Sequence, residues 1–541
     1  MSSSSQYNTL ERFNDNEINH CNNSTNISHA DSSSSNNQKQ QQTKNLPQIF
    51  LFDNDNSPME ATGLALNAIA RGIVVMSSLF LGPALLILAQ DAASSCNSSN
   101  NNTKNDDDDD DDGQGCNDDD EGRVYGMRPS SLLTNIGVFS GVFSALLLPL
   151  FGAIVDHTPH RKAIGQWAAI LLSIIKGVEI FVSKSTWFFI SILQVLNYVL
   201  YQAHLCAAFA YTAELSIDPN EQTIYNARFQ TINYFSMLVF LIVVTVSSSL
   251  LNVSDIGQAR VSQTLAFILC SIVFGFAWKW FFHPRPALRQ VPSDSTLLTA
   301  GFRKLSNTSS HILQNWAPLR YFLLSVMLSE SATAALSTIS TTYMMHVLNM
   351  SSSQIGTVFL CVFVAGIPGS KLGGIIGLKI NPLRSALLCL IIFIINTTLA
   401  ALTMTGEESQ HLMYFFAATW GVCLGWLHPT NAALYCTIIP RGQESELMGL
   451  YLFSGLVFSW VPPFLFTFLN EIGASMRIGL ASLNLFFAGG FIFLKMIGDY
   501  QDAVDFARLR GGDGDDNDAW SSAESFDGSK DTKRLSLPPL T

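Results

Sequence analysis

Long apolar segments recur along most of this chain, and they limit what it can fold into more than any other feature. A helix of about 20 apolar residues crosses the hydrocarbon core of a bilayer. Charged residues make up 13% of the chain, whereas they make up about 25% of an average soluble protein. We therefore predict an all-α membrane protein with twelve transmembrane helices, at 61–90, 131–155, 163–182, 186–211, 229–251, 262–282, 320–347, 354–380, 385–405, 411–439, 448–469 and 472–496.

A polar stretch at 283–319 divides these segments into six and six. We expect an N-terminal six-helix bundle at 59–282, a central cytoplasmic loop at 283–319 and a C-terminal six-helix bundle at 320–497. The flanks differ in composition, since 1–58 is rich in Ser, Asn and Gln and 498–541 is acidic and rich in Gly and Ser. Neither flank can bury enough apolar surface to offset its ordering entropy. Both are predicted to be disordered and cytoplasmic.

Basic residues set the predicted orientation. Arg161 and Lys162, with most other Arg and Lys residues of the connecting loops, lie on one side. Loops rich in Lys and Arg stay in the cytoplasm, so the opposite loop at 91–129 faces a lumen or the exterior. Its aspartate run at 106–112 could attract protons or calcium ions or form a solvated spacer. The run lacks the ligand spacing of a calcium loop.

Two further features of the 91–129 loop fit a luminal face. Asn97 and Asn101 each begin a glycosylation triplet, which is modified only on a luminal or external face. Cys96 and Cys116 lie in the same loop and could pair as a disulfide if the lumen is oxidising. The triplets and the charge bias predict the same orientation.

Several classes of function are disfavoured by the motifs that the sequence lacks. The cysteines show no Cys-x-x-Cys pair and no Cys/His cluster, so no metal site is predicted. The net charge of −12 comes largely from two acidic stretches, and there is no basic surface for nucleic acid. No Gly-x-x-x-x-Gly-Lys motif is present, so direct ATP drive is not supported. We expect no cofactor, no catalytic residues and no enzyme activity.

Ionisable residues also lie within the apolar segments. A charge at the bilayer centre costs about 2.5–3.5 kcal/mol on insertion scales, so such residues usually face a cavity or a partner. Lys176 and Glu179 are spaced i,i+3 and are predicted to neutralise each other as a structural pair. The first, fourth, seventh and tenth segments hold four more: Arg71, His204, Glu330 and His428. The alternatives are that Arg71 extends to the cytoplasmic interface and that the others bond a neighbouring helix.

The turn between the second and third segments has a recognisable spacing. Gly152 lies four residues before Asp156, and Arg161 and Lys162 open the next segment. The turn resembles the signature loop between helices 2 and 3 of the major facilitator superfamily, although Pro159-His160 replaces its usual Gly-Arg step. An ordinary positively charged turn is the alternative. The resemblance implies that Gly152 allows close helix approach and that a cytoplasmic gate forms from Asp156, Arg161, Lys162, Glu214 and Arg228.

The two halves look like a repeat. Residues 373–384, between the eighth and ninth segments, form a degenerate counterpart of the 152–162 turn, with glycines, a proline and basic residues in similar places. Halves related in this way are typical of facilitator transporters, which bind substrate at their interface near mid-membrane.

The C-terminal half carries a longer match. The run 439–451 looks like the Ile-Pro-basic-Gly-x-Glu-x-Glu-x-x-Gly-Leu-Tyr stretch of the vacuolar amino-acid effluxer family, an autophagy-linked branch of the facilitator superfamily. Asn431 and Ala432 stand where that family often has Ser-Arg. The motif residues that match are Pro440, Gly442, Glu444, Glu446 and Gly449.

This resemblance implies roles for the four ionisable residues. Helices 1, 4, 7 and 10 line the central cavity of the facilitator fold, and they hold Arg71, His204, Glu330 and His428. We hypothesise that Arg71 and Glu330 face each other across the cavity. Arg71 would bind a substrate carboxylate, because a guanidinium matches it bidentately, and Glu330 would bind an ammonium group or carry a proton. The two histidines change charge near neutral pH and would link transport to a pH gradient.

We therefore predict a secondary transporter that exports small organic solutes, amino acids first among them, from a vacuole- or lysosome-like compartment. Its partners would be a small-molecule substrate, protons and the lipid bilayer, and it would act as a monomer. The membrane would be vacuolar, with the plasma membrane or a plastid envelope as alternatives. The rival functions are transport of another solute, such as a sugar, nucleotide or pterin, and a non-transporting membrane scaffold or nutrient sensor.

Overall fold

The computed structural model describes residues 59–101, 123–212, 215, 219–286, 297–439 and 444–510. The predicted disordered segment 1–58, and residues 511–541 of the tail predicted to be disordered from residue 498, lie outside these ranges. The prediction is wrong for the start of that tail, where residues 500–510 form a helix that buries Ala503 and Ala507. The described part of the chain is almost wholly helical, and its one isolated β bridge joins Val124 to Met127.

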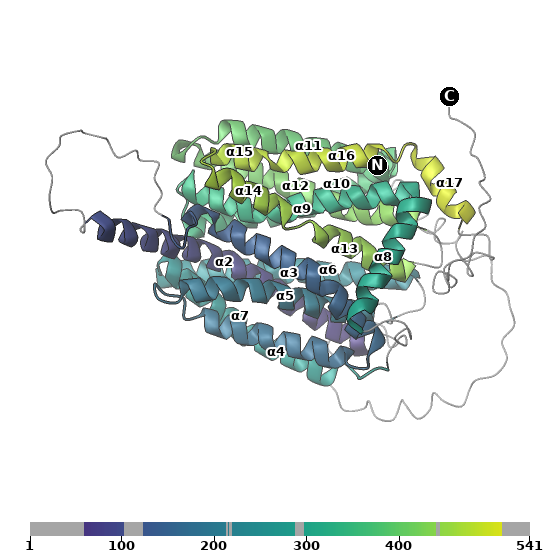
Figure 1. Cartoon of the computed structure of the whole chain (residues 1–541), viewed down its shortest axis with the longest axis horizontal. Helices are drawn as coiled ribbons and strands as arrows, with labels where there is room; N and C mark the ends of the chain where they lie inside the picture. The colour runs from purple at the N-terminus through teal and green to yellow at the C-terminus, as the bar shows by residue number, and fades with distance from the viewer. Residues whose placement is uncertain are drawn as a thin grey trace, which may run out of the picture. The chain divides into compact units, whose positions relative to one another are not determined.

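All twelve predicted segments are helical, and Figure 1 shows the long helices running roughly alongside one another. The last two segments are each built from two consecutive helices. The N-terminal half contains α2 (Met59–Asn101), α3 (Leu132–His157, preceded by the 3-10 turn Pro129–Ser131), α4 (Arg161–Glu179), α5 (Trp187–Thr212), α6 (Pro219–Leu251) and α7 (Asp255–Trp280). The C-terminal half contains α9 (Ala317–His346), α10 (Ser352–Ile380), α11 (Pro382–Thr403), α12 (Gln410–Ile438, preceded by the 3-10 turn Glu407–Ser409), α13 (Glu444–Val457), α14 (Val461–Glu471), α15 (Met476–Ala481) and α16 (Leu483–Lys495).

The two halves share one internal arrangement. In the N-terminal half, α2 packs against α5, α6 and α7, α4 packs against α5 and α7, and α3 packs against α5. The C-terminal half repeats these contacts in the same chain order, because α9 packs against α12, α13 and α16, α11 packs against α12 and α16, and α10 packs against α12. Between the halves, α3 contacts α14 and α10 contacts α6, which are also counterparts. The predicted pair of pseudo-symmetric bundles is confirmed.

Among the described residues, ten helical stretches are long and apolar enough to cross a membrane. The two predicted segments outside that set are α4 and α12. Both pack within their own half, α4 against α5 and α7, and α12 against α10 and α11. Polar groups in a membrane segment are tolerated where they face other helices rather than lipid. Their polarity therefore fits a place inside the bundle.

The stretch at 283–319, for which the sequence predicts a loop, contains the helix α8 (Leu297–Asn315). One face of α8 is buried through Thr308 and Ile312, while Phe302 is exposed. Gly301 lies against the backbone of Pro149 on α3, where a side chain would overlap it. Apolar residues at helical spacing inside a polar stretch explain the helix. Figure 1 shows α8 crossing the helix ends on the side where α17 (Tyr500–Arg510) also lies.

Close backbone contact joins α10 to α12. A Cβ atom added at Gly369, Gly421 or Gly425 would overlap backbone atoms of the facing helix, namely those of Val422, Val362 and Gly366. Small residues let membrane helices approach closely. Dispersion contacts stabilise the pair, because the hydrophobic effect does not drive helices together inside lipid. These glycines therefore fix the spacing between α12 and α10, and α10 in turn contacts α6 of the other half.

Replacing Gly425 by alanine should destabilise the protein by about 1–3 kcal/mol, because α12 must shift away from α10 to accept the methyl group. The measurement is the thermal unfolding midpoint of the purified protein in detergent. Gly374 on the same helix pair is the matched control, since nothing lies within 4 Å of its Cβ position. Equal midpoints for Gly425→Ala and Gly374→Ala would contradict the packing argument.

Candidate functional site

A carboxylate and an imidazole meet between α9 and α12. His428 Nδ1 lies 3.2 Å from Glu330 Oε1, and Asn431 Nδ2 donates to the same oxygen at 3.3 Å. The side chains are 17% exposed for Glu330 and 40% exposed for His428, so the pair is neither sealed nor fully solvated. Glu330 Oε2 has one weak neighbour, the Thr333 hydroxyl at 3.5 Å. That oxygen is the part of the site best placed to accept another donor.

Local sequence explains how this cluster forms. His428 and Asn431 are three residues apart on α12 and so project from the same side of the helix. Gly455 on α13 lies beside Glu330, and a Cβ there would meet the Glu330 side chain at 3.7 Å. Asn431, one of the two departures from the family motif, thus bonds the carboxylate directly. Its role could not be read from the sequence, because helical rotation about α12 is not fixed by segment boundaries.

Arg71 lies on α2 in the other half and is 7% exposed. Its Nε has no hydrogen-bond partner among the described residues, and the guanidinium forms no ion pair there. Tyr201 on α5 is close enough to interact electrostatically with Arg71. A buried guanidinium without an acceptor is costly. Arg71 therefore differs from the other three predicted ionisable residues, since Glu330, His204 and His428 each have a hydrogen-bond partner.

Arg71 and Glu330 form no ion pair with each other in this conformation of the described residues, although we hypothesised that they face each other. Two tyrosines lie near them instead. Tyr201 on α5 is near Arg71, and Tyr234 on α6 is near both Tyr201 and Glu330. Sequence reasoning missed both tyrosines, because a tyrosine in an apolar segment carries no sign of where its hydroxyl points.

His204 occupies a different environment from the other three candidates. It is fully buried, and its Nε2 accepts a hydrogen bond of 3.1 Å from the indole N–H of Trp278 on α7. Its ring also meets that of Phe274 edge-on. Arg71 is within electrostatic reach of His204, but the imidazole is directed into the core of the N-terminal half. The structure thus brings His428, and not His204, to Glu330.

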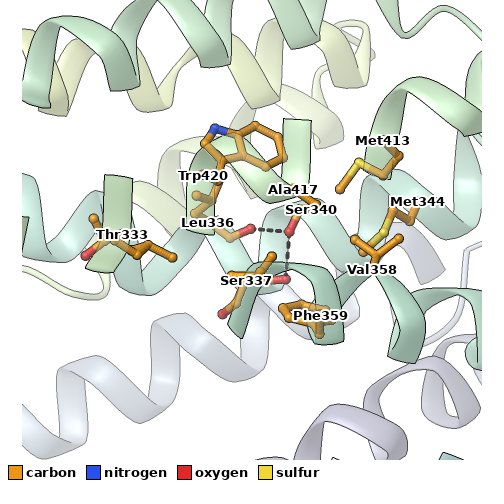
Figure 2. Close-up of a pocket in the computed structure, with 12 residues that line it drawn as sticks. Thr333, Leu336, Ser337, Ser340, Met344, Val358, Phe359, Met413, Ala417 and Trp420 are labelled. Atoms are coloured by element: carbon orange, nitrogen blue, oxygen red, sulfur yellow. Dashed lines mark hydrogen bonds between the residues drawn. The ribbon is translucent and has the colours of Figure 1, made fainter. Parts of the chain in front are cut away.

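A pocket of about 50 Å³, shown in Figure 2, lies between α9, α10 and α12. Thr333, which contacts Glu330, is one of its lining residues. The hydroxyl of Ser340 donates to carbonyl groups of its own helix, so it is not free to bind a ligand strongly. Apart from Thr333, Ser337 and Ser340, the wall is apolar and includes Phe359 from α10 and Trp420 from α12. The pocket suits an apolar group attached to a polar one.

The predicted pair of Lys176 and Glu179 is confirmed. Lys176 Nζ lies 2.9 Å from Glu179 Oε2 with both side chains fully buried. Ser78 on α2 and Gln194 on α5 supply the remaining bonds, at 3.1 Å to Lys176 and 2.6 Å to Glu179. Both charges are thereby satisfied within the N-terminal half.

The expected cytoplasmic gate is described in part. Arg161 is 1% exposed and lies 5.4 Å from the ring centre of Tyr211. Lys162 is partly buried and Arg228 is exposed. No atom lies within 4 Å of a Cβ position at Gly152, so the close approach implied there is not made in this conformation. The side chain of Asp156, and Glu214 as a whole, lie outside the described residues.

Three residues that the sequence reasoning missed join Arg161. Glu60, near the start of α2, forms an ion pair with Arg285, beyond α7. Arg285 also lies over the Tyr211 ring, 5.7 Å from its centre, and the Tyr211 hydroxyl donates to the His283 carbonyl. Glu60 and Arg285 are 225 residues apart, so no local pattern could have paired them.

Several other predicted residues remain untested. Pro440, Gly442 and Cys116 lie outside the described residues. Asn97, Asn101 and Cys96 belong to α2, and Glu444, Glu446 and Gly449 to α13, but only their backbone is described. Within the described ranges, no group of three or more potential metal ligands lies together.

Solved structures with a similar fold include a mutant of the nucleoside transporter NupG. It matches with a TM-score of 0.54 and 10% identity, over 82% of this chain and 99% of that one. The human organic anion transporter MFSD10 (TETRAN) matches with a TM-score of 0.54 and 14% identity, over 81% of this chain and 99% of that one. Comparison with curated proteins returns no match.

Two related six-segment bundles of this topology define the major facilitator fold, whose carriers bind substrate at the interface of the two repeats. The family described as "Vacuole effluxer Atg22 like" matches residues 220–504, which is more than half of the chain. The chain belongs to this family, and it is accordingly a multi-pass membrane transporter and not an enzyme.

Replacing Glu179 by alanine should destabilise the protein by about 3–5 kcal/mol, because the buried ammonium of Lys176 loses its counter-charge. The folded yield and the unfolding midpoint in detergent measure this, with exposed Glu408→Ala as the control. The double variant K176M/E179L removes both charges and should recover much of the loss. A normal midpoint for Glu179→Ala, together with lost transport, would show that the pair acts in transport instead.

Proposed function

We propose that this protein exports amino acids from a vacuole- or lysosome-like compartment by alternating access, with protons as the coupling ion. The observation that carries the proposal is the contrast between two sites on opposite halves. Arg71 offers a buried guanidinium whose Nε has no acceptor among the described residues, and Glu330 offers a carboxylate oxygen whose described neighbour is the Thr333 hydroxyl at 3.5 Å. An amino acid carries the two complementary charges on one small molecule.

Each end of the substrate would have its own partner. The carboxylate would bind Arg71 through paired, charge-assisted hydrogen bonds. The ammonium group would bind Glu330, whose other oxygen is held by His428 and Asn431. The side chain of the substrate would enter the apolar pocket that begins at Thr333. Binding at both ends would draw the halves together, because Arg71 and Glu330 are not paired without it.

Proton coupling would use the same carboxylate. A proton held by His428 would leave the Glu330 carboxylate charged for the ammonium group, so proton and substrate would bind together and leave the compartment together. Glu330 would stabilise that proton through its 3.2 Å contact with His428. Histidine is suited to this role because its charge changes near neutral pH. The family description supports efflux from the vacuole, and a vacuolar membrane is the location that we propose.

A different organic solute is the rival function. Arg71 alone would suit any carboxylate or phosphate, and MFSD10, a protein of similar fold, is described as an organic anion transporter. Proteoliposomes loaded with labelled amino acids and given a pH gradient distinguish the two. Efflux of amino acids supports the proposal, efflux of anions lacking an amino group favours the rival, and no efflux of either favours a sensor or scaffold.

Replacing Arg71 by glutamine should lower kcat/KM for amino-acid transport at least about tenfold, because a charged hydrogen-bonded contact contributes roughly 1.5–3 kcal/mol. Arg71→Lys keeps the charge but loses the bidentate geometry, so its kcat/KM should lie between those of the wild type and Arg71→Gln. The matched control is Arg303→Gln, which removes an exposed arginine on α8. Wild-type transport by Arg71→Gln would remove Arg71 from the site.

Replacing Glu330 by glutamine should abolish the dependence of transport on pH, because the amide can neither stabilise a proton on His428 nor attract an ammonium group. Transport by the variant is measured at several pH values with and without a proton gradient. Exposed Glu408→Gln is the control for carboxylate loss. A pH profile for Glu330→Gln that overlays that of the wild type would end this part of the proposal.

A further inference from the structure

Two carboxylates at one end of the bundle make the same kind of bond across the two halves. Glu471, the last residue of α14, accepts a hydrogen bond of 3.0 Å from the backbone N–H of Arg128, just before the turn that leads into α3. Asp255, the first residue of α7, accepts one of 3.1 Å from the backbone N–H of Ser352, which begins α10. We call this end luminal, following the predicted orientation.

These two bonds are counterparts in the repeat. The α3 and α10 helices hold the same place in their respective halves, and each meets the other half, α3 at α14 and α10 at α6. Glu471 lies in the connection after the eleventh segment, and Asp255 lies in the connection after the fifth. A carboxylate from each half therefore meets the start of the second helix of the opposite half.

The physical basis is the end of a helix. The first N–H groups of a helix have no partner within it and carry a partial positive charge, which an acceptor with negative charge stabilises. Each carboxylate satisfies one such group that belongs to the opposite half. Neither contact can persist when the halves separate at this end, since both are direct bonds between them.

The Glu471 contact is reinforced by its surroundings. Glu471 Oε2 forms an ion pair with Arg123 at 3.2 Å. The neighbouring Asn470 is buried and donates to the hydroxyls of Ser130 and Ser131, both at 2.8 Å. Thr134 and Thr467 lie with their hydroxyl oxygens 2.7 Å apart. The contact between α3 and α14 is thus polar, specific and held at several points.

The turn between Arg123 and Arg128 is fixed to the N-terminal half. Tyr125 adopts a positive φ of 51° between Val124 and Met127, which pair with each other. Its ring packs against those of Trp187 and Phe188 at the start of α5. Through this turn, the bond from Glu471 connects α14 to α5 as well as to α3.

The far ends of the same helices are described in part, and there Gly301 of α8 lies against Pro149 of α3. Among the described residues, no atom lies within 4 Å of a Cβ position at Gly152 on α3, or at Gly374 and Gly377 on α10. At their luminal ends, in contrast, Gly137 meets Pro463 and Gly356 meets Phe80 of the opposite half. The described structure is held together at the luminal end.

We propose that Glu471 and Asp255 are positioning residues of the transport cycle, two symmetry-related latches that hold the luminal end closed and must both release before substrate can enter from the lumen. They act through the helix ends that they bind and not through contact with substrate. The inference depends on alternating access, but not on which solute is carried.

The test measures how often the cavity opens to the lumen. Ser337 is exposed and lines the pocket next to Glu330, so Ser337→Cys reports access to that region. Full-length variants are placed in sealed vesicles without substrate. We compare the rates at which a membrane-impermeant maleimide labels this cysteine from the luminal side. The parent chain with Ser337 intact gives the background from native cysteines.

Glu471→Gln and Asp255→Asn should each raise the luminal labelling rate about fivefold, the effect of losing one charged helix-end contact. Because the latches are separate, the double variant should show about the product of the two effects. Glu408→Gln, which removes an exposed carboxylate, should leave the rate unchanged. If Glu471→Gln does not fold, Asp255→Asn tests the same claim alone.

Unchanged labelling in well-folded Glu471→Gln and Asp255→Asn would overturn the proposal. An equal increase of the labelling rate in the Glu408→Gln control would overturn the proposal too, since the effect would then come from a general loss of charge. If the protein does not transport amino acids, the labelling result still stands, because no substrate is present in the measurement.

Discussion

An ionisable group inside a membrane helix must be bonded by protein or reached by water, and this requirement organises the whole bundle. Lys176 and Glu179 meet it completely, since each is bonded both to the other and to a second helix of the N-terminal half. Glu330 meets it in part, through His428 and Asn431, and keeps one oxygen nearly free. Arg71 does not meet it in the described structure, because its buried Nε finds no acceptor. Fully hydrogen-bonded ionisable groups stabilise the fold, whereas those with fewer protein partners are the candidates for binding a ligand.

The repeat gives these groups their setting. Each half builds the same contacts among its six segments, and the halves meet through helices that are counterparts, α3 with α14 and α10 with α6. Within the C-terminal half, glycines on α10 and α12 bring backbones into contact and fix the helix that carries His428 and Asn431. Stiff halves that meet through polar contacts at one end can separate there without unfolding, because the bonds that break lie between the halves. The same architecture therefore supplies both a rigid site and a movable boundary.

Sequence reasoning succeeded where a one-dimensional signal exists. Apolar runs located all twelve segments, because each must satisfy its backbone groups within the bilayer by forming a helix, and the spacing of Lys176 and Glu179 predicted their pairing. The sequence failed where rotation or distance decides the outcome. The sequence predicted the same kind of place for His204 and His428, in segments that line the cavity. Instead, His204 bonds Trp278 in the core and His428 bonds Glu330. Glu60 and Arg285 pair across 225 residues, and Asn431, noted only as a departure from a motif, bonds the central carboxylate. The helix α8 was hidden because its apolar residues are few, although they share one face.

For transport to occur, the halves must part at the luminal end. Cysteines at Thr134 and Thr467, whose hydroxyl oxygens are 2.7 Å apart, are placed to form a disulfide across that contact. The decisive measurement is amino-acid transport by the reconstituted T134C/T467C variant before and after oxidation, followed by reduction. Oxidation should stop transport and reduction should restore it, while the single-cysteine variants should be unaffected. A cross-linked carrier that still transports at the rate of the reduced form would contradict this requirement.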